Sequence, residues 1–229
     1  QYDRLLAKYV DEDGRVDYTD WKASRDDRQQ LRAYLTELSR AYLRIESTSS
    51  ARLAFWINAY NAVTSEGILK EYPTSRIRNH TARVVGYNIW DDLPLSVGGR
   101  DYSLNQIEHD VLRQLGEPRI HFAIVCASVG CPRLLNRAYT AVALDRQLSE
   151  NATDFFSRLG NLRVDARRKR LEISAILDWF GDDFGATQRE RLDSVMPYLP
   201  TAAQAVAREQ SVLVEFLDYD WSLNDQARD

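Results

Sequence analysis

The stretch from Ser49 to Tyr72, SSARLAFWINAYNAVTSEGILKEY, has the clearest helical pattern in the chain. Either Ser49 or Ser50 can cap its first turn. The apolar side of the pattern recurs at the i, i+3, i+4, i+7 spacing of one helix face and comprises Leu53, Trp56, Ile57, Tyr60, Thr64 and Ile68. Pro73 disfavours helical geometry in the residue before it, so we expect the helix to end near Tyr72.

Two asparagines lie beside this apolar stripe. At about 100° per residue, Asn61 falls at the margin of the stripe and Asn58 lies further round. A polar amide in such a place either bonds a nearby backbone group or orients a residue of a functional site. Both interpretations stay open for Asn58 and Asn61, which are candidate substrate-binding or orienting residues.

The rest of the chain contains further helices and short strands, without a repeat or a Pro/Gly-rich linker. Helices are expected at 2–9, 25–43, 103–115, 145–159, 176–180 and 188–199. Extended segments are expected at 16–18, 84–85, 93–97, 102, 120–126, 162–165, 170–173 and 211–217, with a hairpin turn at 98–100. We therefore predict one α+β domain over 1–229, mainly helices around a small antiparallel sheet.

Composition limits the classes of function. The chain has 229 residues, 44% of them hydrophobic and 28% charged, and a net charge of −4. Because no long basic tract is present, we expect no nucleic-acid partner; the short cluster 167–170 is interpreted as a solvated hairpin turn. No run approaches the roughly 20 apolar residues of a membrane span. No nucleotide-binding glycine loop, haem or flavin signature occurs, so no cofactor is expected.

The start of the sequence bears on the compartment. The sequence starts at Gln1 without an initiator Met, which suggests a mature or trimmed chain whose export segment has been removed. Under that expectation the protein is periplasmic or otherwise extracytoplasmic. Two cysteines, Cys126 and Cys131, are too few for a disulfide scaffold and leave the redox compartment open.

The predicted helix 103–115 carries two candidate catalytic residues. Ser103 and Gln106 form a capping-box pattern, and Gly116 is suited to end the helix. Glu108 projects near the centre of the apolar face, where a carboxylate is costly unless it is paired or hydrogen-bonded. His109 lies at the flank. Glu108 is either a structural anchor or a cleft residue, and His109 is either a half-buried structural histidine or a site residue.

Cys126 closes the apolar run 120–126 and enters a turn of small residues. A thiol in that position can be partly exposed beside backbone amides, which could lower its pKa and stabilise an oxyanion. The alternatives are an inert buried cysteine, a disulfide with Cys131 after export, or a metal site with His121 that lacks a clear fourth ligand. Ser128 is either a second polar group of the site or a turn-stabilising hydroxyl.

Five segments resemble the motifs of the DUF547 family, a bacterial and plant family of unknown function. They are AFWINAYNA (54–62), SLNQIEH (103–109), RIHFAIVCAS (119–128), Cys131-Pro132 followed by Tyr139-Thr140, and LDYDWSLN (217–224). The resemblance spans nearly the whole chain. It places the family's polar positions on Asn58, Asn61, Glu108, His109, His121 and Cys126, and implies that many bacterial members follow export signals.

The leading hypothesis is a thiol-dependent hydrolase or acyl transferase acting on a small molecule or peptide. Cys126 would attack a carbonyl, and His109 would act as base and then acid, with His121 as its rival. Glu108 or Asn61 would orient the imidazole, and the amides of 127–130 would receive the oxyanion. Since His109 precedes Cys126, this order fits only a permuted papain-like arrangement. The competing hypothesis is a non-catalytic binding or scaffold domain.

Overall fold

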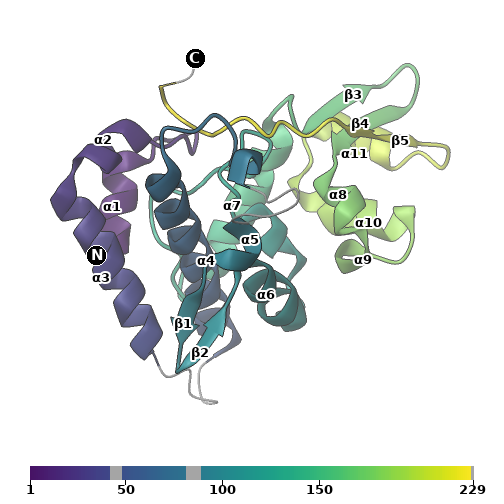
Figure 1. The fold of residues 1–229 in the computed structure, drawn as a ribbon. Coiled ribbons are helices and arrows are strands. Elements are labelled where there is room, and N and C mark those ends of the chain that lie inside the picture. Colours follow the sequence, from purple (N-terminus) through teal and green to yellow (C-terminus); the bar gives the residue numbers. More distant parts are fainter. Residues whose placement is uncertain (42–47, 81–88, 228–229) are drawn as a thin grey trace.

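Helix α4 (Ser49–Glu71) is buried on all sides and passes through the larger part of the molecule (Figure 1). The computed structural model of the chain describes residues 1–41, 48–80 and 89–227. Thr48 caps the helix by accepting from the amide of Ala51, so the predicted cap at Ser49 or Ser50 is one or two residues late. The predicted end near Tyr72 is confirmed.

Three N-terminal helices form a layer beside α4. They are α1 (Tyr2–Tyr9), α2 (Tyr18–Ala23) and α3 (Arg25–Arg40). Leu31 and Leu38 of α3 are buried at the spacing expected for a helix packed along one face. The end predicted at Leu43 lies outside the described residues, and so does the strand predicted at 84–85.

The hairpin predicted around the two adjacent glycines is confirmed. Helix α5 (Ile89–Asp92) leads into β1 (Leu95–Val97), which pairs antiparallel with β2 (Arg100–Tyr102). Gly98 and Gly99 both have positive φ, 58° and 83°, as a two-residue turn between twisted strands requires.

The helical segment after β2 is less regular than predicted. Ser103 and Gln106 form the predicted capping box at the start of α6 (Leu104–Gln106). A π-helical segment (Ile107–Leu112) and a 3-10 turn (Arg113–Leu115) follow, and Gly116 ends the run at φ 70°. Short π segments recur at functional sites, and this one carries Glu108 and His109.

The strand predicted at 120–126 is wrong. Residues Pro118–Phe122 form a 3-10 helix, and the chain continues in irregular conformation through Cys126. Asparagine side chains provide hydrogen bonds that a neighbouring strand would otherwise make. Asn61 donates to the carbonyl of Ala123 and accepts from the amide of Val125, at 3.0 and 2.9 Å. The apolar run therefore reflects burial, which both strands and buried loops require.

The C-terminal part holds a second hydrophobic cluster around a three-stranded sheet. Its helices are α7 (Leu144–Ser157), α8 (Ile176–Trp179), α9 (Gly181–Phe184), α10 (Gln188–Val195) and α11 (Thr201–Ala207). Its strands, in spatial order, are β3 (Leu162–Asp165), β4 (Arg170–Ser174) and β5 (Leu213–Leu217). β3 and β4 form the predicted hairpin through the basic turn, but β5 pairs with β4 in parallel, so this sheet is mixed rather than antiparallel.

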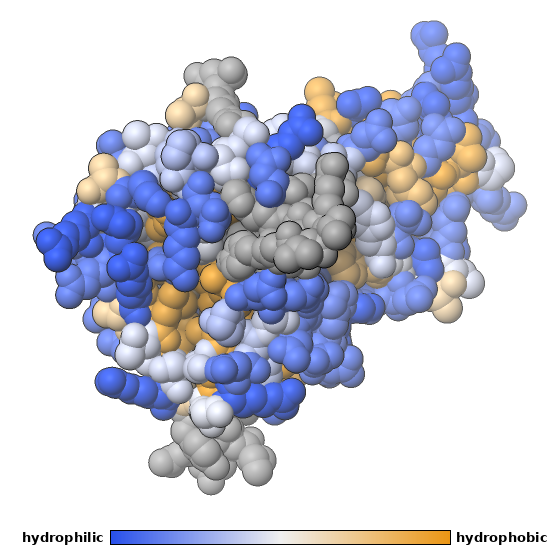
Figure 2. Space-filling view, in the orientation of Figure 1, coloured by the Kyte–Doolittle hydropathy of each residue, from blue (hydrophilic) through white to orange (hydrophobic). Residues whose placement is uncertain are grey.

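The observed class is α+β, with helices dominating, as predicted. The sheet projects at one end of the molecule (Figure 1), and hydrophobic side chains gather over it, with a second hydrophobic area on the same face away from the sheet (Figure 2). The first and larger hydrophobic cluster includes the buried side chains of α1, α3 and α4. Tyr219 follows β5 and packs against both clusters. Within the described part of the chain, the helices are all too short or too polar to cross a membrane.

Candidate functional site

A cavity of about 650 Å³ brings the four predicted catalytic residues together, namely Glu108, His109, His121 and Cys126. It is lined by residues from six segments of the chain: Tyr60, Trp90, Asn105, Glu108, His109, His121, Ile124, Cys126, Cys131, Pro132, Ile176, Trp179, Phe180, Tyr219 and Trp221. Volumes of this size are typical of small-molecule sites, in which an apolar wall surrounds a few convergent polar groups.

Aromatic rings form one wall of the cavity. Trp221 stacks with Trp179 at 5.8 Å between ring centroids and lies 4.5 Å from Tyr219. Trp90 meets Trp221 edge-on at 6.4 Å. Trp179 is 48% exposed, which is unusual for so large an apolar side chain. This wall therefore offers ring faces to a ligand.

His121 is fixed by a carboxylate that the sequence analysis did not identify. Its Nε2 lies 2.7 Å from Oδ2 of Asp183 in α9, and Phe180 stacks on the ring at 4.1 Å. Arg113 bonds both oxygens of Asp183, at 2.6 and 2.7 Å, and lowers the pKa of that carboxyl. The ionised carboxylate can only accept, so Nε2 of His121 carries the hydrogen.

The other nitrogen of His121 is left as an acceptor. Burial lowers the pKa of His121 to about 4, so the ring is neutral at pH 7. Its Nδ1 lies 3.8 Å from Oε1 of Glu108. The lone pair of the imidazole is therefore on the side that faces Glu108.

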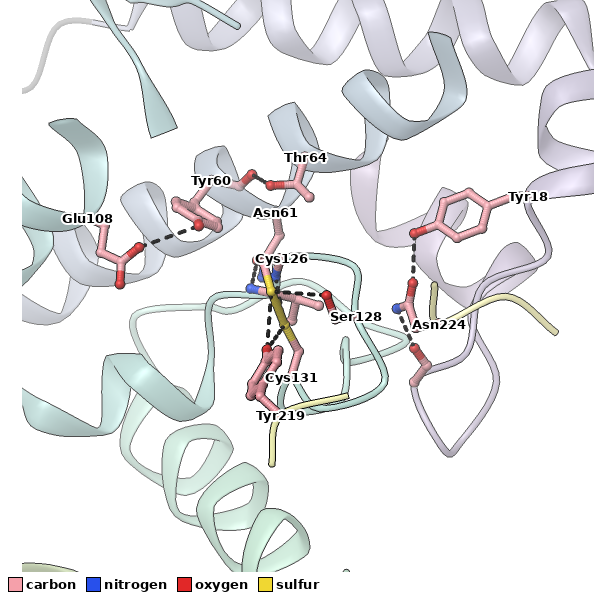
Figure 3. The surroundings of a disulfide bond; sticks show 12 residues. Tyr18, Tyr60, Asn61, Thr64, Glu108, Cys126, Ser128, Cys131, Tyr219 and Asn224 are labelled. Carbon is pink, nitrogen blue, oxygen red and sulfur yellow. Dashed lines mark hydrogen bonds between the residues drawn. A yellow bond between two sulfur atoms is a disulfide. The ribbon is translucent and has the colours of Figure 1, made fainter. Parts of the chain in front are cut away.

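Glu108 is buried, with 8% of its surface exposed. Burial raises the pKa of its carboxyl to about 7, and the cation of Arg113 opposes that shift. The Tyr60 hydroxyl from α4 donates to Oε2 at 3.5 Å, as Figure 3 shows. A carboxyl with this pKa changes its protonation state near neutral pH, which suits general acid–base chemistry.

His109 lies at the exposed edge of the cavity. Its Nδ1 is 3.0 Å from Nη1 of Arg113, which can only donate. Nδ1 is therefore the acceptor and Nε2 carries the hydrogen. Partial burial and Arg113 together lower the pKa of His109. In this arrangement its acceptor nitrogen is already in use.

Cys126 and Cys131 are joined by a disulfide, one of the alternatives that the sequence left open. Both cysteines line the cavity; Cys131 is 6% exposed and Cys126 is more accessible. The amide of Cys126 and the hydroxyl of Tyr219 each donate to Sγ of Cys131 at 3.0 Å. Tyr219 Oη also lies 3.2 Å from Sγ of Cys126, and Ser128 Oγ lies 3.5 Å from it (Figure 3).

The loop between the cysteines is held by the C-terminal segment 219–224. The amides of Val129 and Gly130 donate to the carbonyls of Ser222 and Asp220, at 2.8 and 2.9 Å. These two amides are therefore occupied and are not available to the oxyanion for which the sequence suggested them. Ala127, next to Cys126, has φ 59°, a strained value for a residue with a side chain. Such strain recurs at functional sites.

Asn58 and Asn61 do not line the cavity. Asn58 donates to the carbonyl of Tyr139 and accepts from its amide, at 2.8 and 2.9 Å, and Asn61 holds Ala123 and Val125 in the same way. Both amides are fully used in holding the loops that carry His121 and the cysteines. Any effect on a ligand would therefore act through those loops.

Comparisons with known proteins identify one family. Residues 45–156 match the family model described as "Protein of unknown function, DUF547". The match contains Glu108, His121 and both cysteines but ends before Asp183, so the near full-length resemblance inferred from the motifs was overstated. No curated protein and no solved structure matches the chain. In the described residues, no three or more His, Cys, Asp or Glu side chains are grouped to hold a metal ion.

Proposed function

The chain belongs to the DUF547 family, and from the geometry of the cavity we propose that it is a thiol-dependent hydrolase or acyl transferase with reduced Cys126 as nucleophile. The observation that carries the proposal is that Cys126 opens into the same cavity as Glu108, a buried carboxyl with a pKa of about 7. A nucleophile and a group matched to neutral pH are the two components that acyl transfer needs.

Glu108 and His121 would together accept and return the proton of the Cys126 thiol. Asp183 fixes the tautomer of His121, whose acceptor nitrogen faces Glu108. Glu108 would take the thiol proton and return it to the leaving group as the thioester forms. Water would then attack the thioester in hydrolysis, and an acceptor nucleophile would attack it in acyl transfer. We prefer this pair to His109, whose acceptor nitrogen already receives a bond from Arg113.

Tyr219 would stabilise the oxyanion. Its hydroxyl lies 3.2 Å from Sγ of Cys126, where the negative oxygen of a tetrahedral intermediate would also lie within reach. Burial raises the pKa of Tyr219 far above its usual range, so the hydroxyl remains a donor at neutral pH.

The test uses the two cysteine variants as a matched pair. Cys131→Ala keeps the nucleophile and cannot form the disulfide, whereas Cys126→Ala removes the nucleophile. With activated esters and thioesters we expect an acyl adduct on Cys131→Ala by intact mass, none on Cys126→Ala, and an alkylation pKa below the ordinary ~8.5. Asp183→Asn should lower the rate of acyl-adduct formation at unchanged folding. Full turnover by Cys126→Ala would refute the proposal.

A non-catalytic binding domain is the second candidate, and the exposed ring of Trp179 favours it. In that case the aromatic wall would hold a ligand and the polar residues would only maintain the loops. Trp179→Ala would then abolish ligand binding, while Cys131→Ala would show an ordinary thiol pKa and no adduct with any ester.

A further inference from the structure

Cys126 and Cys131 both line the cavity, and Cys126 is the more exposed of the two. We propose that Cys126 and Cys131 are a redox-active pair: an external dithiol attacks Cys126, and Cys131 leaves as the thiolate. One consequence rests on the proposed function: the nucleophile Cys126 is blocked until the disulfide is reduced. The exchange itself stands on the surroundings of the two sulfurs.

Accessibility distinguishes the two sulfurs. Cys131 is 6% exposed and packs in the larger hydrophobic cluster, whereas Cys126 is only partly buried and borders the cavity. Attack on a disulfide occurs at the sulfur that the thiolate can approach. Cys126 is therefore the expected site of the mixed disulfide.

Hydrogen bonding favours Cys131 as the leaving sulfur. The amide of Cys126 and the hydroxyl of Tyr219 both donate to its Sγ at 3.0 Å. Donors to sulfur stabilise a thiolate and lower its pKa, and a thiol of lower pKa leaves faster. Tyr219 belongs to the C-terminal segment that also anchors Gly130, so this donor stays in place when the sulfur bond breaks.

Reduction does not require the fold to open. The amides of Val129 and Gly130 are bonded to the C-terminal segment, and Asn61 holds the chain just before Cys126. The disulfide closes a loop of only a few residues, and short loops gain least from a crosslink. The crosslink is therefore a small part of what holds this loop.

The reaction balances with a dithiol as reductant. One thiolate of the dithiol attacks Sγ of Cys126, the bond between the two cysteines breaks, and Cys131 takes the electron pair as a thiolate. The second thiol of the dithiol then attacks the sulfur that the dithiol contributes to the mixed disulfide. This closes the dithiol into a ring and releases Cys126. Two electrons pass to the protein, the dithiol becomes a cyclic disulfide, and two protons accompany the two new thiols.

The experiment follows the folded, oxidised protein in dithiothreitol at pH 7.5. We expect complete reduction without denaturant, with unchanged far-UV circular dichroism. Tyr219→Phe should slow it by about three- to fivefold, because losing one donor raises the pKa of the leaving thiol. With a chromogenic aromatic disulfide, Cys131→Ser should form a mixed disulfide at Cys126 much faster than Cys126→Ser does at Cys131.

The outcomes separate the two proposals. If reduction occurs only in denaturant, or if both single-cysteine variants react at equal rates, the redox inference is overturned. If exchange proceeds as expected but reduced protein and Cys131→Ala form no acyl adduct, the redox inference stands and the proposed hydrolase or transferase function fails. If acyl adducts form on Cys131→Ala but the disulfide of the folded protein resists dithiothreitol, the proposed function stands and the redox inference is overturned.

Discussion

Replacing Glu108 with glutamine should change the pH dependence of stability in a defined direction. Burial raises the pKa of this carboxyl from 4.5 to about 7 on folding. The folded protein therefore holds the proton more tightly than the unfolded chain does. Between these two pKa values the unfolded chain has released its proton and the folded protein has not, so stability falls as pH rises. Above the folded pKa the full cost of a buried, ionised carboxylate is present.

The size of the effect follows from the two pKa values. The slope is about 1.4 kcal/mol for each pH unit between them. From pH 5 to pH 8, the wild-type protein should lose roughly 2–3 kcal/mol through this group alone. Glu108→Gln keeps a side chain of the same shape but does not titrate. The difference in unfolding free energy, variant minus wild type, should therefore rise by the same amount.

The assay is urea unfolding of both proteins at pH 5, 6, 7 and 8, with the disulfide intact. Glu66→Gln is the matched control, because Glu66 is also buried, lies on α4 away from the cavity, and pairs with Arg32 at 3.2 Å. That variant loses an ion pair and should be less stable than wild type at pH 8. A difference between Glu108→Gln and wild type that stays flat across this range would refute the reasoning and remove the basis for proton transfer by Glu108.

Two further predictions concern the backbone around the site. Asn61→Ala leaves the carbonyl of Ala123 and the amide of Val125 unpaired in a buried place, so urea unfolding should show a loss of roughly 2–4 kcal/mol; a loss below about 1 kcal/mol would contradict the structural role. Gly14 and Gly116 both have positive φ, but a Cβ at Gly14 would lie 2.4 Å from a neighbouring side chain and one at Gly116 meets nothing within 4 Å. Gly116→Ala should therefore cost about 1 kcal/mol and Gly14→Ala distinctly more, and equal losses in thermal unfolding would argue against crowding.

Sequence patterns predicted the elements whose signals are local. The capping box at Ser103, the paired glycines at 98 and 99, and the stop before Pro73 each act within a few residues, and the structure has all three. The segment 120–126 was predicted wrongly because its partner is not local. Its hydrogen bonds come from Asn61, more than 60 positions earlier, and an apolar run alone cannot distinguish a buried strand from a buried loop.

The residues of the site also divide into those with a local sequence signal and those without one. Glu108 could be found because a carboxylate on an apolar helix face is a visible conflict within one helix. Asp183 could not, because nothing near it in the sequence indicates that its carboxylate meets His121, 62 positions earlier. Tyr219 lies in a segment that resembles the family motifs, but only the fold brings its hydroxyl to the sulfurs.

The two histidines of the cavity differ in which nitrogen remains open, and this bears directly on the chemistry. Arg113 contacts both systems: it donates to Nδ1 of His109 and to the carboxylate of Asp183. The first bond occupies the acceptor of His109, whereas the second holds the carboxylate of Asp183 in place beside Nε2 of His121 and lowers its pKa further. The guanidinium of Arg113 thus disfavours His109 as a base and, through Asp183, favours His121. Replacing Arg113 with lysine, which cannot make the two-pronged bond, should loosen the carboxylate of Asp183 beside His121 and free Nδ1 of His109, while the cavity stays lined as before.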